Sequence, residues 1–145
     1  MSRVLTFVAA VAATIAFPSI ALSHSAGRNA WSGVYGKAQA ARGAAAYAAN
    51  CAACHGNALG GSDSAPALTG GSFLANWDGQ SGSALFVRIK TTMPLNNPGS
   101  LGAAKVADIE SFILSRNGFP AGTADLPADA AQQSLISITQ GKPTK

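Results

Sequence analysis

The two cysteines of the chain lie in one short stretch, Cys51-Ala52-Ala53-Cys54-His55. Residues three positions apart share one face of a helical turn, so both thiols would point the same way and His55 would follow them directly. This spacing is the attachment pattern of c-type haem, in which each thiol forms a thioether and the histidine binds the iron. The stretch therefore predicts one covalently attached haem c, held by Cys51, Cys54 and His55.

Two other interpretations of the cysteines stay open beside a chance match. A Cys51–Cys54 disulfide of the thioredoxin type is expected in a βαβ context, whereas the flanks here are Ala/Gly-rich helix and loop. A structural zinc site needs four ligands, and residues 24–145 hold only two Cys and two His, so His24 would have to join. The sequence favours haem over both.

Met93 is the candidate for the second axial ligand of the iron. Apart from Met1 it is the only methionine, and it follows His55 by 38 residues. It lies in a polar, proline-locked stretch, Thr91-Thr92-Met93-Pro94, and not on an apolar helix face. Electron-transfer cytochromes use His/Met or His/His ligation. The alternative ligand, His24, predicts a bis-histidine spectrum and low-spin iron that persists in a Met93→Ala variant.

The first 23 residues have the features of a secretory signal peptide. Arg3 precedes an apolar run from Val4 to Leu22 that is broken by Pro18, and Ala21-Leu22-Ser23 puts small residues at the cleavage-site positions. We expect cleavage after Ser23, with an uncleaved anchor as the alternative. Because c-type haem is attached outside the cytoplasm, this agrees with the haem motif. It predicts a periplasmic protein with no membrane span after cleavage.

Composition indicates one domain that is short of bulky core residues. The hydrophobic class reaches 48%, but 31 of these residues are alanine. Leu, Ile, Val and Phe make up about 17% of residues 24–145, a fraction typical of disorder only when net charge is high. The net charge of this part is +3, so we expect a buried prosthetic group to complete the core. The basic residues form no stripe with interleaved aromatics, which argues against nucleic-acid binding.

The pattern of apolar residues predicts an all-α domain with long loops. Alanines favour a helix over residues 37–49, and residues 72–77 are expected to form one helical turn. A helix capped by Ser83 would carry Leu85 and Ile89 and end before Pro94. Ser100 would open the clearest helix, which ends at Gly118; its apolar stripe is Val106, Ile109, Phe112 and Ile113.

These elements divide the chain into four parts. We expect a cleaved signal peptide (1–23), a flexible lead-in (24–36), the domain itself (37–118) and a C-terminal tail that packs on it (119–145). The only bulky cluster of the tail is Leu135, Ile136 and Ile138.

Residues 43–118 resemble the class I c-type cytochromes, which implies their small fold of helices wrapped around one haem. Gly43-Ala-Ala-Ala-Tyr47 is similar to the first helix of that family, whose glycine and aromatic cross the last helix, here at Phe112. Pro66 matches the loop proline whose carbonyl accepts the proton of the haem histidine. Trp77 lies where relatives place a ring that reaches a haem propionate, although a partly buried core aromatic fits equally well. Arg88 and Lys90 could pair with propionates or face solvent.

A closer resemblance is to the small periplasmic cytochromes that accompany pyrroloquinoline quinone dehydrogenases. It implies a monomeric, mono-haem carrier of single electrons, not an enzyme, between a quinoprotein (alcohol) dehydrogenase and an oxidase or other cytochrome of the respiratory chain. The alternatives are a tightly bound subunit of a dehydrogenase or oxidase complex and, with an open iron position, a haem peroxidase or gas sensor. The stretches that carry the resemblance are Phe73-Leu-Ala-Asn-Trp77, Ile89-Lys-Thr-Thr-Met-Pro94, Asn97-Pro-Gly-Ser-Leu101, Asn117-Gly-Phe-Pro120 and Leu126-Pro-Ala-Asp-Ala-Ala131.

Overall fold

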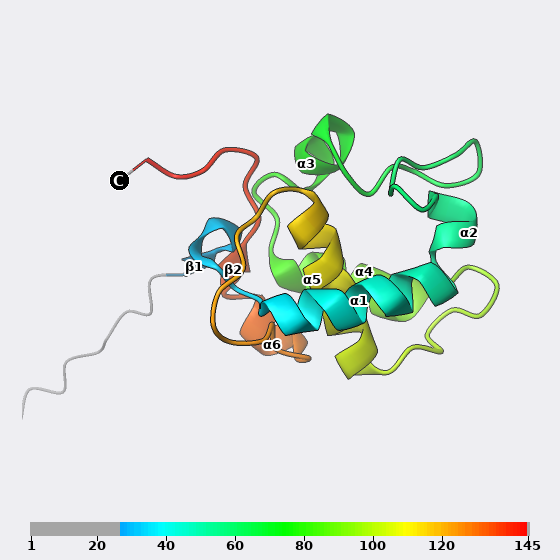
Figure 1. The fold of residues 1–145 in the computed structure, drawn as a ribbon. Coiled ribbons are helices and arrows are strands. Elements are labelled where there is room, and N and C mark those ends of the chain that lie inside the picture. Colours follow the sequence, from blue (N-terminus) through cyan, green and yellow to red (C-terminus); the bar gives the residue numbers. More distant parts are fainter. Residues whose placement is uncertain (1–26, 145) are drawn as a thin grey trace, which may run out of the picture.

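The computed structural model describes residues 27–144, and the described part of the chain is mostly helical (Figure 1). The predicted signal peptide and His24 lie outside the described residues. None of the helices in residues 27–144 is both long enough and apolar enough to cross a membrane. The predicted all-α architecture is confirmed, with one short strand pair added to it.

The core is built on the crossing of α1 (Lys37–Asn50) and α5 (Ala103–Arg116). Alanines stabilise α1, and α5 buries the predicted stripe of Val106, Ile109 and Ile113. At the crossing, a Cβ on Gly43 would run into the backbone carbonyl of Asp108, so only glycine lets the two helices approach this closely.

The aromatic pair predicted at this crossing is present. The rings of Tyr47 and Phe112 have their centroids 5.4 Å apart and are tilted by 54°. Tilted pairs at this separation are favourable because the positive edge of one ring meets the negative face of the other.

A third helix, α4 (Gly82–Thr92), packs on α5 and buries Leu85, Phe86 and Ile89. It ends before Pro94, as predicted. The expected cap was wrong, because Ser81 and not Ser83 has the extended backbone of an N-cap and accepts the N–H of Ala84.

The start of α5 also differs from the prediction. Ser100 does not open the helix, because its backbone N–H closes a turn onto the carbonyl of Asn97. Leu101 is then buried, and Gly102 is the N-cap without a side-chain hydrogen bond.

Two further short helices are α2 (Ala52–His55) and α3 (Gly71–Trp77). Helix α3 begins one residue before its predicted range.

Within residues 27–36 the structure does not have the expected flexible lead-in. Strand β1 (Arg28–Asn29) pairs in parallel with β2 (Ile136–Ser137), and a 3-10 helix follows at Ala30–Ser32. The ring of Trp31 packs on Phe119 at a centroid distance of 4.6 Å, and the Tyr35 hydroxyl donates to the Phe119 carbonyl. The aromatic side chains of Trp31 and Tyr35 therefore hold this segment against the domain. The Ser/Gly-rich composition of the segment does not predict this packing.

The C-terminal tail lies against the domain and carries the short helix α6 (Ala130–Gln133). Leu126, Ile136 and Ile138 are buried, whereas Leu135 is 54% exposed. The buried amide of Gln39 makes two hydrogen bonds to the backbone of Leu126, accepting from its N–H at 2.6 Å and donating to its carbonyl at 3.0 Å. Figure 1 shows β1, β2 and α6 at one end of α1 and α2 at the other.

Candidate haem-attachment site

The Cys51–His55 stretch forms one tight turn at the junction of α1 and α2. Cys51 ends α1, where its N–H donates to the carbonyl of Tyr47 at 2.8 Å, and it also precedes α2. The Cys51 carbonyl accepts the N–H groups of Cys54 and His55 at 3.2 and 2.9 Å. Both cysteines are free thiols, Cys51 half-buried and Cys54 exposed. The structure thus brings the two predicted thioether positions and the histidine together.

The ring of His55 is oriented by the loop that follows it. His55 is 8% exposed, and its Nδ1 lies 2.8 Å from the carbonyl oxygen of Pro66. Because that oxygen can only accept, Nδ1 carries the hydrogen and Nε2 keeps its lone pair. Metal-ligating histidines commonly have this arrangement. It is the hydrogen bond that the resemblance assigns to Pro66, while the ligand role of His55 itself stays a prediction.

Further hydrogen bonds fix the backbone on both sides of His55, and sequence reasoning missed them. The buried hydroxyl of Tyr47 donates to the Gly56 carbonyl at 2.8 Å, and the Ser62 hydroxyl donates to the Cys54 carbonyl at 2.8 Å. Gly61 has φ +77°, and a Cβ there would lie 2.6 Å from the nitrogen of Ala67. The Gly-Gly pair before Ser62 is the one sequence signal that could have indicated this tight loop.

Two side chains of the site, Cys51 and Tyr47, have raised pKa values. Burial, and secondarily Cys54, raises the pKa of the Cys51 thiol to about 11. Burial, and secondarily Cys51, raises the pKa of Tyr47 to about 12. Since thiolates are the form that binds zinc and exchanges disulfides, the environment of Cys51 does not favour either alternative role for that residue. Among residues 27–144, no group of three or more His, Cys, Asp and Glu side chains could hold a metal ion.

Met93 and Trp77 come from other elements. Met93 follows α4, where its N–H donates to the Ile89 carbonyl at 3.1 Å. Trp77 ends α3 and packs on Phe73 at a centroid distance of 6.1 Å. Both side chains are half-buried against the core. Among the described hydrogen bonds, none joins either residue to the His55 loop, so their roles toward haem stay predictions.

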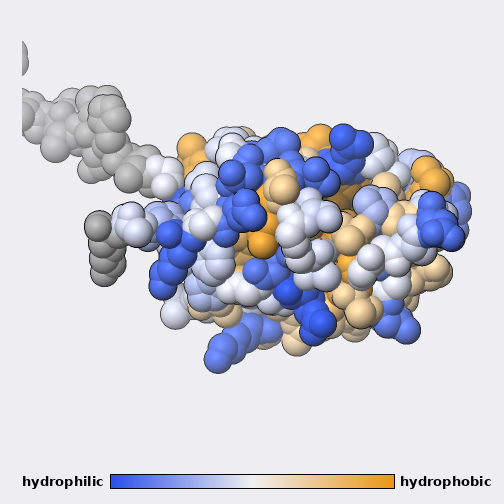
Figure 2. Space-filling view, turned by 90° about the horizontal axis from the view of Figure 1, so that it is seen from above, coloured by the Kyte–Doolittle hydropathy of each residue, from blue (hydrophilic) through white to orange (hydrophobic). Residues whose placement is uncertain are grey.

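The donor set fits haem c. It comprises the two free thiols, the imidazole of His55 and the thioether of Met93. Among the described residues, the Nε2 of His55 has no hydrogen-bond partner. A porphyrin also needs apolar contacts, and Figure 2 shows hydrophobic residues among hydrophilic ones on the face seen from above in Figure 1. Half-buried apolar residues that pack on the core include Cys51, Ala52, Leu68, Leu74, Trp77, Met93 and Phe112.

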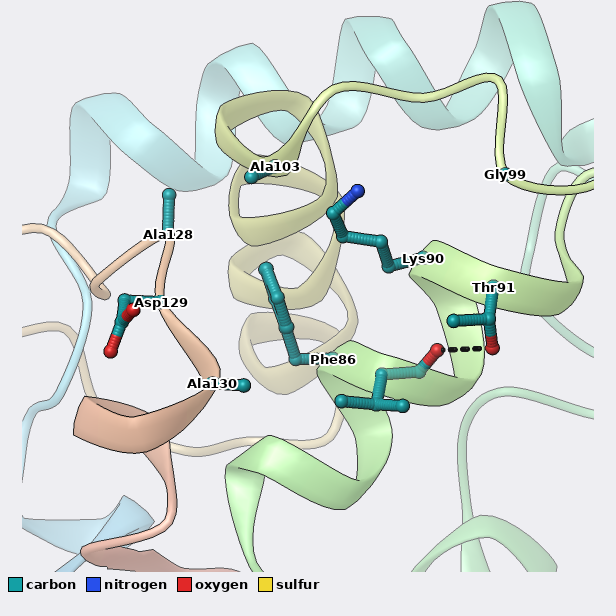
Figure 3. Close-up of a pocket in the computed structure, with 9 residues that line it drawn as sticks. Phe86, Lys90, Thr91, Gly99, Ala103, Ala128, Asp129 and Ala130 are labelled. Atoms are coloured by element: carbon teal, nitrogen blue, oxygen red, sulfur yellow. Dashed lines mark hydrogen bonds between the residues drawn. The ribbon is translucent and has the colours of Figure 1, made fainter.

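The two basic residues considered for the propionates differ in their surroundings. Arg88 is exposed, whereas Lys90 is half-buried. Figure 3 shows Lys90 beside an open cavity of about 610 Å³, which Phe86, Ala103 and Asp129 also line. Pairing with a propionate stays a prediction for both.

The chain matches a known family of cytochrome c domains. Residues 38–113, just over half of the chain, match the family described as "Cytochrome C oxidase, cbb3-type, subunit III". The chain belongs to this family of cytochrome c domains, which confirms the class I c-type cytochrome indicated by its sequence. Membership implies haem c with iron, and Cys51 and Cys54 are the cysteines present for its attachment.

The comparison with solved structures found a chain in the crystal structure of the sulfane dehydrogenase SoxCD from Paracoccus pantotrophus. The match has 29% identity and a TM-score of 0.46, and it covers 56% of this chain and 44% of that one. The chain thus spans less than half the length of this relative. No curated protein matched the chain.

Proposed function

We propose that this cytochrome is a periplasmic mono-haem carrier of single electrons, which receives them from a quinoprotein (alcohol) dehydrogenase and passes them toward the respiratory chain. Bound haem c supplies a one-electron couple between ferric and ferrous iron. The observation that carries the proposal is the His55–Pro66 hydrogen bond next to the two free thiols.

Each predicted site residue has a defined task in this proposal. Cys51 and Cys54 would attach the haem through two thioethers, and the Nε2 of His55 and the sulfur of Met93 would bind its iron. The Pro66 carbonyl holds the Nδ1–H of His55, which fixes the ring plane and raises the basicity of the ligand.

A carrier fits this ligand set better than an enzyme or a gas sensor. If His55 and Met93 both bound the iron, they would leave no free coordination position for a substrate, so peroxide turnover or gas binding would require displacement of Met93. Carbon monoxide therefore separates these functions: weak binding supports the carrier, and tight binding supports a sensor or peroxidase.

The quinoprotein donor is supported by the resemblance alone, above all by the stretches Phe73–Trp77 and Asn117–Pro120. Recognition of the donor is proposed to use a small apolar patch at the exposed haem edge. Because the two propionates bring the net charge close to neutral, the transfer rate should depend only weakly on salt.

A second candidate is a tightly held electron-transfer subunit of an oxidase or dehydrogenase complex. The description of the matched family, which names an oxidase subunit, favours it. A stable complex would co-purify from the periplasm through several columns, whereas a diffusing carrier would elute alone.

The test of the donor is a visible difference spectrum. The full chain is expressed with haem-attachment machinery, a primary alcohol is added to the periplasmic fraction, and dithionite follows. If alcohol raises the ferrous c-type bands, the quinoprotein link is supported; if only dithionite does, the link fails but the cytochrome stands. A Cys51→Ala/Cys54→Ala chain is the matched control and should show neither response.

A further inference from the structure

A buried carboxyl group outside the haem site lacks a partner. Glu110, on α5, is 0% exposed, and neither of its carboxyl oxygens has a hydrogen-bond partner among the described residues. The only other buried side-chain oxygen in this state, within residues 27–144, is Oε1 of Gln133 on α6. Because a buried polar atom without a hydrogen-bond partner destabilises the folded state, these oxygens need an explanation.

One unpartnered oxygen of each residue lies beside the first residue of α4. A Cβ placed on Gly82, the first residue of α4, would be 3.2 Å from the Gln133 Oε1 and 3.6 Å from the Glu110 Oε1. Helices α4, α5 and α6 therefore meet at this point, and the absence of a side chain at Gly82 leaves space for the side chains of Glu110 and Gln133.

The orientation of the Gln133 amide is set by its other partner. Its Nε2 donates to the carbonyl of Pro127 at 2.7 Å. That carbonyl can only accept, so a flipped amide would set oxygen against oxygen. Oε1 must therefore point away from Pro127, and it needs a donor. An ionised Glu110 has none to offer, whereas a protonated Glu110 has one O–H.

Within residues 27–144, none of the ion pairs involves Glu110. The described ion pairs join Arg42 to Asp108 and Asp125. On α4, Arg88 is exposed and Lys90 is half-buried beside the cavity of Figure 3, and Asp129 before α6 is exposed and accepts the N–H of Gln132. Burial raises the pKa of Glu110 well above its ordinary value. The neighbouring Gln133 side chain lowers this pKa, but by less than burial raises it.

We propose that Glu110 and Gln133 form a buried proton-binding site, in which Glu110 keeps its proton at neutral pH and donates it in a hydrogen bond to the Gln133 Oε1. This bond ties α6, and with it the C-terminal tail, to α4 and α5. Loss of the proton would leave a buried carboxylate facing an amide oxygen, so deprotonation and detachment of α6 are coupled.

The direct test is infrared spectroscopy of the holoprotein at pH 7. A protonated carboxylic acid has a C=O stretching band above the amide I band, and this band shifts in heavy water. We expect the band in the parent protein and its loss in Glu110→Gln. The control variant is Asp108→Asn, which removes a carboxyl group that lies on the same helix and is paired with Arg42. This variant should keep the band. A parent protein without this band would overturn the proposal, whether or not the variants fold.

The second test is the pH dependence of unfolding. Because folding raises the pKa of Glu110, the folded state holds a proton that the unfolded chain releases above about pH 4.3. Stability is therefore highest at lower pH and falls as pH rises toward the folded pKa. Relative to Glu110→Gln, the unfolding constant of the parent should rise up to about tenfold per pH unit in this window. Parallel pH profiles for the two proteins would contradict a proton held by Glu110.

Discussion

The imidazole of His55 is held by the backbone carbonyl of Pro66. A carboxylate in that place could gain a proton and change the orientation of the ring, whereas an amide carbonyl does not titrate in the physiological range. The acceptor of the Nδ1–H of His55 therefore stays the same as pH changes. The orientation of the His55 ring therefore depends on a backbone group and not on another side chain.

Replacement of Met93 by alanine tests the second axial ligand. The variant should keep its covalent haem, because Cys51 and Cys54 are intact, but its ferric spectrum should change from low spin to high spin. Carbon monoxide should bind the ferrous variant readily. Absorption spectra of parent and variant measure both effects. Low-spin iron retained in the variant would instead point to ligation by His24.

Sequence reasoning found the residues whose chemistry is rare and missed those whose chemistry is common. Two cysteines and one internal methionine can be interpreted individually, and the Pro66 carbonyl followed from a resemblance. The hydroxyl of Tyr47, the amide of Gln39 and the carboxyl of Glu110 could each have faced solvent. Their partners are set by tertiary packing, which brings together groups that are far apart in the chain.

At the scale of elements, the α1–α5 crossing was predictable because its signals are local and steric. Gly43 and Tyr47 lie one turn apart on one face, and the apolar stripe of α5 has a clear helical period. Helix starts were less predictable, since several serines and glycines stand near each one. Ser81 precedes α4 and Ser83 lies inside it, and tertiary packing decides between them.

Gly43→Ala tests the close approach of these helices. The added methyl group would overlap the Asp108 carbonyl, so α1 and α5 must move apart and unfolding should become easier by about 3 kcal/mol. Denaturant unfolding of the holoprotein measures this loss. Gly71→Ala, at a helical position with open space around it, is the control and should stay within about 1 kcal/mol of the parent. Equal stability of the two variants would show that the crossing is looser than described.

On the scale of the whole molecule, the N-terminal segment and the C-terminal tail close on each other. Strands β1 and β2 pair, and the Gly122 N–H donates to the Tyr35 carbonyl at 2.7 Å. Composition could not predict this for the lead-in, because its Trp31 and Tyr35 stand among Ser and Gly and gain meaning only once Phe119 lies beside them.

Two substitutions separate apolar burial from charge as the force that holds the tail. Ile138→Ala removes a fully buried side chain and should destabilise the protein by about 2 to 5 kcal/mol. Arg42→Ala removes the exposed pairs to Asp108 and Asp125 and should leave the unfolding midpoint nearly unchanged, because exposed ion pairs are screened by solvent. Denaturant titrations of both variants measure this, and a larger loss for Arg42→Ala would reverse the assignment.

The central claim is that Cys51 and Cys54 carry haem through two thioether bonds. Its most direct test is the visible spectrum in alkaline pyridine of the full chain, expressed with haem-attachment machinery and then denatured and extracted with acidified organic solvent. We expect the haem to stay with the polypeptide and to give the spectrum of a porphyrin with both vinyl groups saturated. Haem that passes into the solvent, or a chain without haem, would contradict it.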